Sequence, residues 1–556
     1  MFDRHRDTFT RAQQAVARRD CWSPFPEMPG KYPDTEAAQA AGLAWFNAQL
    51  CQPFELDQPG IIGQVGEEVS PYTQDPLGIA YPQSDPDALF TAAQSAIPAW
   101  AAAEIDTRLG VLMECLDTIY RDHMFAIVQS VMHTAGQSFN MAYAGSGVNA
   151  LDRGIEVLVH AEAAMRFTPE SARWERRFGP SEIKLEKTYR LIPRGVAVCF
   201  ACASFATWNA WPSILASLAT GNAVILKPHP MSVLPMAITV RAWRQVLAAA
   251  GFDPNLLTLC VDTVAQPLGK TLIKHPSCAI VDFTGSARFG AWVEANAHPA
   301  LAFTETSGVN TVVIQGAQDL DAALRSLATT MCMFSAQMCT SPQTVYLPPE
   351  VATPDGPVPR DEVAQRLAQA IARLVEDPKK ASMILATVQS PQTLRDISAI
   401  REEGARRGQV LLDSRPYAHP AFPNARTATP LLLALGKDAR DLYATERFGP
   451  IGFVVACDSP EDALAQATRD ARENGGITGF VYATDEGFIG AAEAAYAQAG
   501  AQLTVNLTGA MPLNFAAAYS DYHVTGLNGA GNATLTTLAF VASRFAVAQS
   551  RRPVEG

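Results

Sequence analysis

Residues 195–230 read GVAVCFACASFATWNAWPSILASLATGNAVILKPHP, and the pattern of this segment is the most informative about the fold class. Every residue between Arg194 and Lys227 is uncharged, over a length that could span a bilayer. Polar and helix-breaking residues interrupt the run at Asn209, Pro212, Gly221 and Asn222. We therefore predict no membrane segment here. The pattern instead indicates a strand at 196–199, a helix at 211–219 and a strand at 223–226.

The same alternation continues after this unit. Helical patterns (MAITVRAWRQVLAAAG, AQPLGKTLIK, ARFGAWVEANA) alternate with short β-rich runs (LLTLC, AIVDF). Such βαβ units feed a parallel sheet that binds dinucleotides at the carboxyl ends of its strands. A second alternation begins near Thr311 with VVIQ and reaches about Asn506, with VYL, QVLL, GFVVAC and GFVYA as expected strands. The sequence thus predicts two α/β lobes that meet near Gly308.

Composition excludes several classes of protein. The 556 residues exceed what one hydrophobic core supports, and 48% hydrophobic with 18% charged residues is ordinary for a globular protein. The net charge of −12 argues against a nucleic-acid partner. Ten cysteines are scattered without paired spacing, so we expect no metal site and a reducing, cytoplasmic location. The N-terminal residues resemble neither a secretory signal nor a membrane anchor.

Two short motifs carry the chemistry. Glu305 lies in FTETSGVN, and Cys339 lies in SAQMCTSPQTVYL. Each is weak alone, because a cysteine in an apolar run is more often a buried filler than a nucleophile. Cys332, on the same run, is the cysteine that we assign to packing.

Together these motifs resemble the aldehyde dehydrogenase superfamily, in which E-x-x-G-x-N ends the cofactor lobe and Q-x-C opens the catalytic lobe. The resemblance implies that Cys339 attacks an aldehyde, that hydride transfer to a nicotinamide cofactor gives a thioester, and that Glu305 activates the water that cleaves it. The structural alternative for Glu305 is an exposed strand or helix end.

Two further motifs resemble the family's cofactor site. In VDFTGSARFG, Gly285 and Ser286 stand between a strand and a helix, where unpaired N–H groups can meet a pyrophosphate. In ATERFGPIGFVV, Glu446 and Phe448 match the residues that hold the nicotinamide ribose and line its pocket. Alone, the second motif would be no more than a turn with a surface glutamate.

A third cofactor motif is GNAVILKPHP, which delivers Lys227, Pro228 and His229 at a strand end. In the family this lysine contacts the adenosine ribose, and a glutamate three residues later often binds its hydroxyls. Here that position is Pro230. The loss of a carboxylate that would repel a 2′-phosphate, with His229 beside Lys227, favours NADP over NAD.

The oxyanion loop departs from the family. In place of the usual N-F-P segment the chain reads ASFATWNAWP, which puts Ser204 or Ala206 near the asparagine position. Asn209 could substitute as the third catalytic residue, with the Cys339 N–H carrying more of the oxyanion. Asn209 could equally be a turn residue or a cap before the helix.

The resemblance implies an α/β fold with a Rossmann-type cofactor-binding lobe, an α/β catalytic lobe and a small bridging or oligomerisation arm. We assign a helical extension to 1–60 and the catalytic domain to 309–524. The cofactor-binding domain takes 61–168 and 195–308, and the bridging segments take 169–194 and 525–556. We expect a homodimer or a dimer of dimers.

Within the superfamily, residues 190–230, the ETSGVN variant and the N-terminal extension look like the PaaN group of phenylacetic acid degradation. That likeness implies oxidation of a CoA-linked semialdehyde, and the CoA phosphates could meet Arg173, Arg176 and Arg177. An oligomer contact is the other use of these arginines. Two alternatives remain for the function: a CoA-acylating dehydrogenase, and a non-catalytic nicotinamide-binding protein of the same fold.

Overall fold

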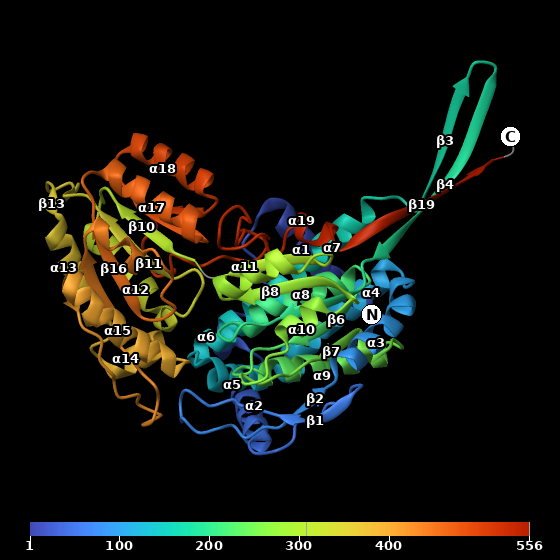
Figure 1. Cartoon of the computed structure of the whole chain (residues 1–556), viewed down its shortest axis with the longest axis horizontal. Coiled ribbons are helices and arrows are strands. Elements are labelled where there is room, and N and C mark those ends of the chain that lie inside the picture. Colours follow the sequence, from blue (N-terminus) through green and yellow to red (C-terminus); the bar gives the residue numbers. More distant parts are fainter. Residues whose placement is uncertain (307, 555–556) are drawn as a thin grey trace.

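Two α/β lobes lie side by side in the computed structural model, and a narrow arm projects from one of them (Figure 1). The structure describes residues 1–306 and 308–554, so the last two residues of the predicted segment 525–556 lie outside it. Within the described residues, no helix is long and apolar enough to cross a membrane. The predicted α/β class is confirmed.

The first lobe is built on a five-stranded, all-parallel sheet with the order β7-β6-β5-β8-β9. Helices cover it, and its central strands are buried along nearly their whole length, as expected for a parallel sheet covered on both faces. The strands in chain order are β5 (Val196–Phe200), β6 (Ala223–Lys227), β7 (Leu257–Leu259), β8 (Cys278–Gly285) and β9 (Leu301–Thr306).

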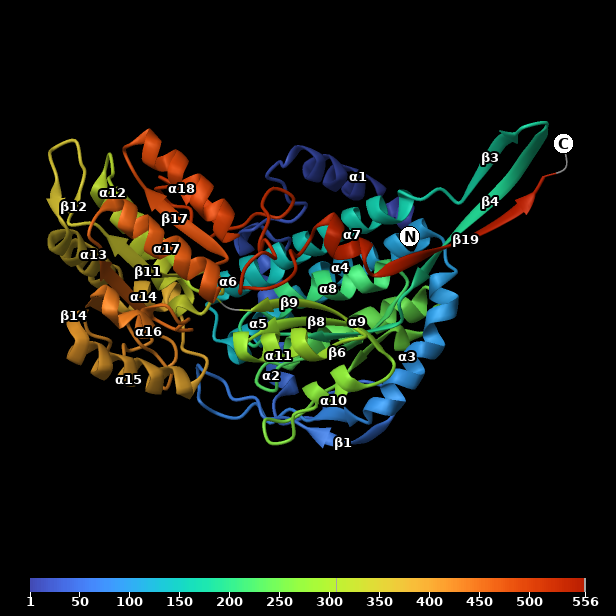
Figure 2. The same ribbon diagram turned by 45° about the horizontal axis from the view of Figure 1, so that its top comes forward.

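The helices of this lobe include the N-terminal ones, which pack on it (Figure 2). Those drawn in blue and teal come from the first 170 residues, and the green ones connect the strands. They are α1 (Phe2–Arg18), α2 (Thr35–Gln49), α3 (Pro86–Ala101), α4 (Ile105–Thr118), α5 (Met124–Ala135), α6 (Phe139–Tyr143), α7 (Ala150–Arg166), α8 (Ala206–Ala219), α9 (Leu234–Ala249), α10 (Gly269–Lys274) and α11 (Ala287–Asn296).

Helix α8 begins at Ala206, five residues earlier than the sequence pattern predicted. The pattern placed the boundary at Trp211 because asparagine and proline commonly mark helix starts. Tertiary packing overrides that preference: Thr207 and Ala210 are buried, and the Thr207 hydroxyl donates to the Ser146 carbonyl at 2.6 Å. As a consequence, Asn209 stands in the first turn of a buried helix rather than in a loop.

The second lobe carries a seven-stranded mixed sheet with the order β14-β15-β16-β11-β10-β17-β18. All neighbours are parallel except β14 and β15, which are antiparallel. The sequence pattern missed β15 and β18. The strands are β10 (Asn310–Ile314), β11 (Pro342–Leu347), β14 (Gly408–Leu412), β15 (Leu431–Leu435), β16 (Ile451–Ala456), β17 (Thr478–Tyr482) and β18 (Gln502–Val505). The helices flanking this sheet include α12 (Leu320–Cys332), α13 (Arg360–Leu374), α15 (Pro391–Arg407), α17 (Pro460–Asn474) and α18 (Glu486–Ala499).

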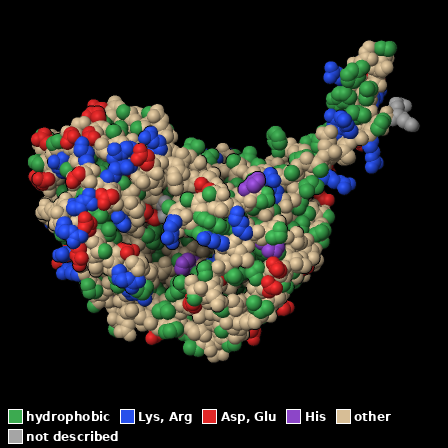
Figure 3. Space-filling view, viewed as in Figure 1, with side chains coloured by type: hydrophobic (Ala, Val, Ile, Leu, Met, Phe, Trp, Pro, Cys, Tyr) green, Lys and Arg blue, Asp and Glu red, His purple; other side chains and the backbone are tan. Residues whose placement is uncertain are grey.

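The arm is a three-stranded antiparallel sheet of β3 (Ser171–Phe178), β4 (Ser181–Pro193) and β19 (Phe545–Pro553). Its tip stands away from both lobes, and hydrophobic side chains lie open on it among lysines and arginines (Figure 3). Phe178 and Ile183 are 46% and 43% exposed. Arg173, Arg176 and Arg177 are all on β3, so they lie on the arm.

After β18 the chain leaves the second lobe and returns to the first. Thr306 on β9 donates its N–H to the Ala530 carbonyl at 2.7 Å, and the Asn532 N–H donates to the Thr304 carbonyl at 3.1 Å. These bonds attach the returning segment to the open edge of the first sheet. The segment thereby crosses the junction between the lobes, where the predicted site residues lie.

Candidate active site

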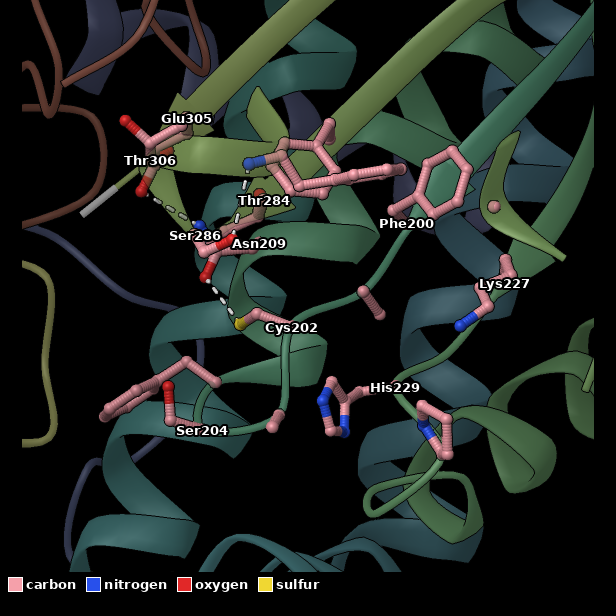
Figure 4. Close-up of a pocket in the computed structure, with 18 of the residues that line it drawn as sticks. Phe200, Cys202, Ser204, Asn209, Lys227, His229, Thr284, Ser286, Glu305 and Thr306 are labelled. Atoms are coloured by element: carbon pink, nitrogen blue, oxygen red, sulfur yellow. Dashed lines mark hydrogen bonds between the residues drawn. The ribbon is translucent and has the colours of Figure 1, made fainter. Parts of the chain in front are cut away.

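A cavity of about 680 Å³ lies between the lobes at the carboxyl ends of the first sheet. Glu305 and Asn209 lie toward one end of it, and Lys227 and His229 toward the other (Figure 4). Cys339 also lines this cavity. The structure therefore brings together the predicted nucleophile, the predicted base and most of the predicted cofactor residues.

Cys339 follows a turn with an unusual backbone. Phe334, Ser335 and Ala336 have φ of 48°, 51° and 52°, in the left-handed region that residues with a side chain rarely adopt. Each such residue costs about 1–3 kcal/mol, so surrounding contacts must impose the conformation. The Ser335 hydroxyl donates to the Leu385 carbonyl at 2.9 Å, and Gln337 Nε2 donates to the Thr387 carbonyl at 2.8 Å.

The E-x-x-G-x-N motif, at residues 305–310, also fixes the position of Cys339. Asn310 Nδ2 donates to the carbonyl of Cys339 at 2.7 Å, and Asn310 Oδ1 accepts from the N–H of Ile477 at 3.0 Å. Gly308 must be glycine, because a Cβ there would lie 1.8 Å from the Gly475 carbonyl oxygen. Asn310 thus links the backbone at Cys339 to the backbone at Ile477 and holds Cys339 between the two sheets.

The Cys339 thiol has an acidic, desolvated environment. Its Sγ lies 3.7 Å from Glu305 Oε1 and 3.7 Å from His523 Nε2. Desolvation in the pocket, followed by the negative charge of Glu305, raises the pKa of the Cys339 thiol well above its ordinary value. The thiol is therefore protonated at neutral pH in this state, and its use as a nucleophile requires a proton acceptor.

Glu305, at the end of β9, is buried and meets two nitrogen groups at one oxygen. Asn209 Nδ2 donates to Glu305 Oε1 at 3.1 Å, and His523 Nε2 lies 2.9 Å from the same atom. Glu305 Oε2 has no hydrogen-bond partner among the described residues. The Cys202 thiol donates to Asn209 Oδ1 at 3.6 Å, as Figure 4 shows.

His523 is a site residue that the sequence reasoning missed. It belongs to the returning segment, is 4% exposed, and its ring meets Trp208 edge-on with centroids 4.6 Å apart. No local motif surrounds it in AAAYSDYHVTG. Only the attachment of that segment to β9 brings the imidazole to Glu305.

A second, smaller cavity of about 120 Å³ meets the first at Cys339 and Asn209. Apart from His523, its side chains are uncharged, and many are apolar or aromatic. The lining includes Met141, Phe205, Trp208, Met333, Met338 and Phe515. This arrangement suits an apolar aldehyde that reaches the thiol from the side opposite the larger cavity.

Another part of the wall of the larger cavity forms where β8 ends at Gly285 and α11 follows. Ser286 is the N-cap of α11, and its Oγ accepts from the Phe289 N–H at 3.5 Å. A Cβ on Gly285 would lie 2.8 Å from the Phe283 ring, so the missing side chain keeps this edge of the cavity open. Both residues line the cavity, and a helix N-terminus at an open edge fits a pyrophosphate.

The end of the cavity near Lys227 departs from the prediction. Lys227 Nζ contacts Asp262 Oδ1 at 2.6 Å, and both residues line the cavity. Asp262 is 3% exposed, and its Oδ2 accepts from the Leu268 N–H at 2.9 Å. His229 lines the cavity too, whereas Pro228 is buried and is not among the residues that line it. The sequence did not reveal Asp262, because the expected carboxylate position was three residues after Lys227, whereas Asp262 follows the neighbouring strand β7.

The remaining predicted residues meet at the Cys339 end. Glu446 and Phe448 both line the larger cavity, and the charge of Glu446 adds to the rise in the pKa of Cys339. Ser204 also lines it, and its carbonyl accepts from Gln137 Nε2 at 2.7 Å. Cys332 lies elsewhere, buried at the end of α12, where desolvation raises its pKa to about 12.

Comparisons with known proteins agree with this geometry. The sequence model of the aldehyde dehydrogenase family matches residues 63–508. An NAD-dependent aldehyde dehydrogenase structure from Burkholderia multivorans is 43% identical, with a TM-score of 0.96 over 100% of this chain and 99% of that one. A vanillin dehydrogenase of Pseudomonas fluorescens is 26% identical over 72% of this chain and 78% of its own. A benzaldehyde dehydrogenase of Bacillus subtilis is 23% identical over 73% and 79%.

Proposed function

Because the chain belongs to the aldehyde dehydrogenase family and acts as an NAD(P)-dependent aldehyde dehydrogenase, we propose that it oxidises an apolar aldehyde through a covalent intermediate on Cys339. The observation that carries the proposal is the position of Cys339 at the junction of the two cavities. One cavity has the features of a dinucleotide site, and the other fits a small apolar group.

In the proposed reaction, Cys339 loses its proton to Glu305 Oε1, 3.7 Å away, and Sγ attacks the aldehyde carbon. A nicotinamide dinucleotide would be held in the larger cavity by residues that include Lys227, Ser286 and Glu446, and would supply a hydride acceptor there. After Glu305 has released the thiol proton to solvent through the cavity, its carboxylate takes a proton from the water that cleaves the thioester. Oε2 is the oxygen without a competing partner among the described residues.

Asn209 has two uses in this scheme. One amide hydrogen orients Glu305, and a primary amide carries a second that can reach the oxyanion. The assignment predicts that Asn209→Ala lowers kcat, and unchanged turnover would show it to be wrong.

For the cofactor, the structure supplies an argument that opposes the sequence-based preference for NADP. A carboxylate beside the adenosine ribose accepts from its 2′-hydroxyl and repels a 2′-phosphate, and Asp262 stands beside Lys227 as such a group. It also neutralises the lysine that would attract the phosphate. The 43%-identical Burkholderia multivorans protein is named NAD-dependent. We therefore favour NAD.

Binding of each dinucleotide tests this preference without turnover. Wild type should bind NAD at least about tenfold more tightly than NADP. Asp262→Asn should reduce this ratio of the two dissociation constants, because one unpaired charge contact is worth about 1–3 kcal/mol. Titration of intrinsic fluorescence measures both constants. Tighter binding of NADP by wild type would restore the sequence-based preference.

Two different observations bear on the identity of the aldehyde. The CoA-linked semialdehyde is supported by the sequence resemblance to the PaaN group alone, and Arg173, Arg176 and Arg177 lie on the arm, away from either cavity. The apolar lining of the smaller cavity, together with relatives named for vanillin and benzaldehyde, supports an aromatic aldehyde.

The test is formation of reduced nicotinamide with aromatic aldehydes and a CoA-linked semialdehyde, each with NAD and NADP and with Cys339→Ser as control. Turnover with aromatic aldehydes would support the cavity argument, and turnover confined to the CoA compound would support the resemblance. A rate that depends on free CoA would favour the acylating alternative. Dinucleotide binding without turnover of any aldehyde would favour the non-catalytic one.

The exposed apolar side chains of the arm fit a second copy of the chain, and we propose a homodimer or a dimer of dimers. Light scattering of wild type and of a variant with 172–190 replaced by a short linker tests this. A wild-type monomer would contradict it.

A further inference from the structure

Three side chains of different chemistry converge where the two cavities meet. Cys339 Sγ lies 3.7 Å from Glu305 Oε1 and 3.7 Å from His523 Nε2, and these last two atoms lie 2.9 Å apart. They come from three distant segments: the turn before β11, the end of β9 and the returning segment. A thiolate, an imidazole and a carboxylate are the three ligand types that zinc takes in proteins.

The spacing matches a tetrahedral metal site. With Zn–S of about 2.3 Å and Zn–N and Zn–O of about 2.0–2.2 Å, ligand atoms of a tetrahedral zinc stand about 3.3–3.6 Å apart. Both separations from Sγ are close to this range, and only the separation between Glu305 and His523 must open by about half an ångström. A small rotation of either side chain achieves that.

An unpartnered polar atom points to a ligand in the same place. Glu305 is 3% exposed, yet its Oε2 has no hydrogen-bond partner among the described residues. A buried polar atom without a partner is costly, so an ion that engaged the carboxylate would remove part of that cost. The cavities that meet at Cys339 provide an entry path and room for a fourth ligand.

We propose that Cys339, Glu305 and His523 bind one Zn²⁺ ion per chain, and that the bound ion holds the enzyme inactive. Binding replaces the thiol proton, which leaves to solvent, by the metal, so that a Zn–S bond forms as the S–H bond breaks. The predicted inhibition rests on the proposed function, because the ion would bind both the nucleophile and the base. The predicted binding of Zn²⁺ does not depend on that function.

The surroundings of His523 indicate a reversible site. Ligating histidines commonly donate their other ring N–H to a carboxylate or carbonyl, and loss of that partner costs about 10- to 100-fold in affinity. Here Trp208 orients the ring by an edge-on contact instead. We expect a chelator such as EDTA to remove the ion from the folded protein and restore activity.

The experiment uses the purified full chain stripped of metal, with Zn²⁺ titrated against a chromophoric chelator and Co²⁺ used as a spectroscopic probe. His523→Asn and Cys339→Ser are the test variants. His160→Asn and Cys332→Ala are the matched controls, since both residues are buried and neither lines a cavity described above. Melting curves establish that every variant is folded.

We expect one Zn²⁺ per chain in wild type and in both controls, and a sulfur-to-cobalt charge-transfer band with Co²⁺. His523→Asn should bind Zn²⁺ at least about 100-fold more weakly, more than loss of an outer partner costs, and Cys339→Ser should lose the band. Absence of stoichiometric binding, or undiminished binding by His523→Asn, would overturn the proposal. Aldehyde turnover measured in the same preparations separates this failure from failure of the proposed dehydrogenase activity.

Discussion

The two cavities that meet at Cys339 differ in how their linings are encoded. The larger one is lined mainly by motif residues at strand ends, such as Lys227, Ser286 and Glu446. The smaller one is assembled from separate helices and loops, with Met141, Met338 and Phe515 far apart in sequence. Chemistry common to a family is thus carried by short local motifs, whereas the fit to one aldehyde depends on long-range packing.

The largest effect on activity should come from Cys339→Ser, because Cys339 lines both cavities. Without the thiol, aldehyde oxidation should fall by more than about 1000-fold, because the covalent route is lost. Dinucleotide binding should remain near the wild-type value, since Lys227 and Asp262 are untouched. Steady-state rates and fluorescence titration measure the two effects. Cys332→Ala should keep its activity, and comparable loss there would point to general damage.

Glu305→Gln should slow turnover by about 100- to 10,000-fold, the usual contribution of a general base. The amide keeps the shape of the side chain but cannot accept a proton. Stopped-flow measurement of the first turnover separates the steps. A burst of reduced nicotinamide, followed by a slow steady state, would place the defect in thioester hydrolysis; equal loss of the burst would place it in thiol activation.

Alkylation of the free enzyme should depend on pH through the raised pKa of Cys339. A raised pKa means less thiolate at neutral pH, so the rate with iodoacetamide should climb about tenfold per pH unit and continue to climb above the range of an ordinary thiol. Peptide mass spectrometry measures it, with exposed Cys21 as internal reference. A rate for Cys339 that levels off near neutral pH would contradict the desolvated environment.

Phe515→Ala should act on the aldehyde side alone. Removing an aromatic wall from the smaller cavity should lower kcat/KM for an aromatic aldehyde by about tenfold, as expected for 1–2 kcal/mol of apolar contact. The NAD dissociation constant should be unchanged. If both constants moved together, the two cavities would not be the separate sites described here.

Ser286→Ala should give the smallest effect and act on the cofactor side. Loss of the N-cap costs about 0.5–2 kcal/mol and loosens the first turn of α11. We expect the dissociation constant for NAD to increase severalfold, and the KM for the aldehyde to stay unchanged. An effect on the aldehyde alone would place Ser286 outside the dinucleotide site.

The same contrast explains what the sequence could reveal. The βαβ alternation predicted both sheets, and Gly285, Ser286 and Cys339 were found because each stands in a motif a few residues long. His523 and Asp262 were missed, because each reaches the site through the pairing of a distant strand or loop. The start of α8 was wrong, since burial of Thr207 outweighs the local preferences of Asn209 and Pro212.

The most direct test of the covalent account is mass spectrometry of the wild-type enzyme, quenched with acid during turnover of NAD and a substrate aldehyde. We predict a mass increase equal to the acyl group, located on the peptide that contains Cys339. No adduct during measurable reduction of NAD, or an adduct on Cys202 instead, would contradict the central role of Cys339.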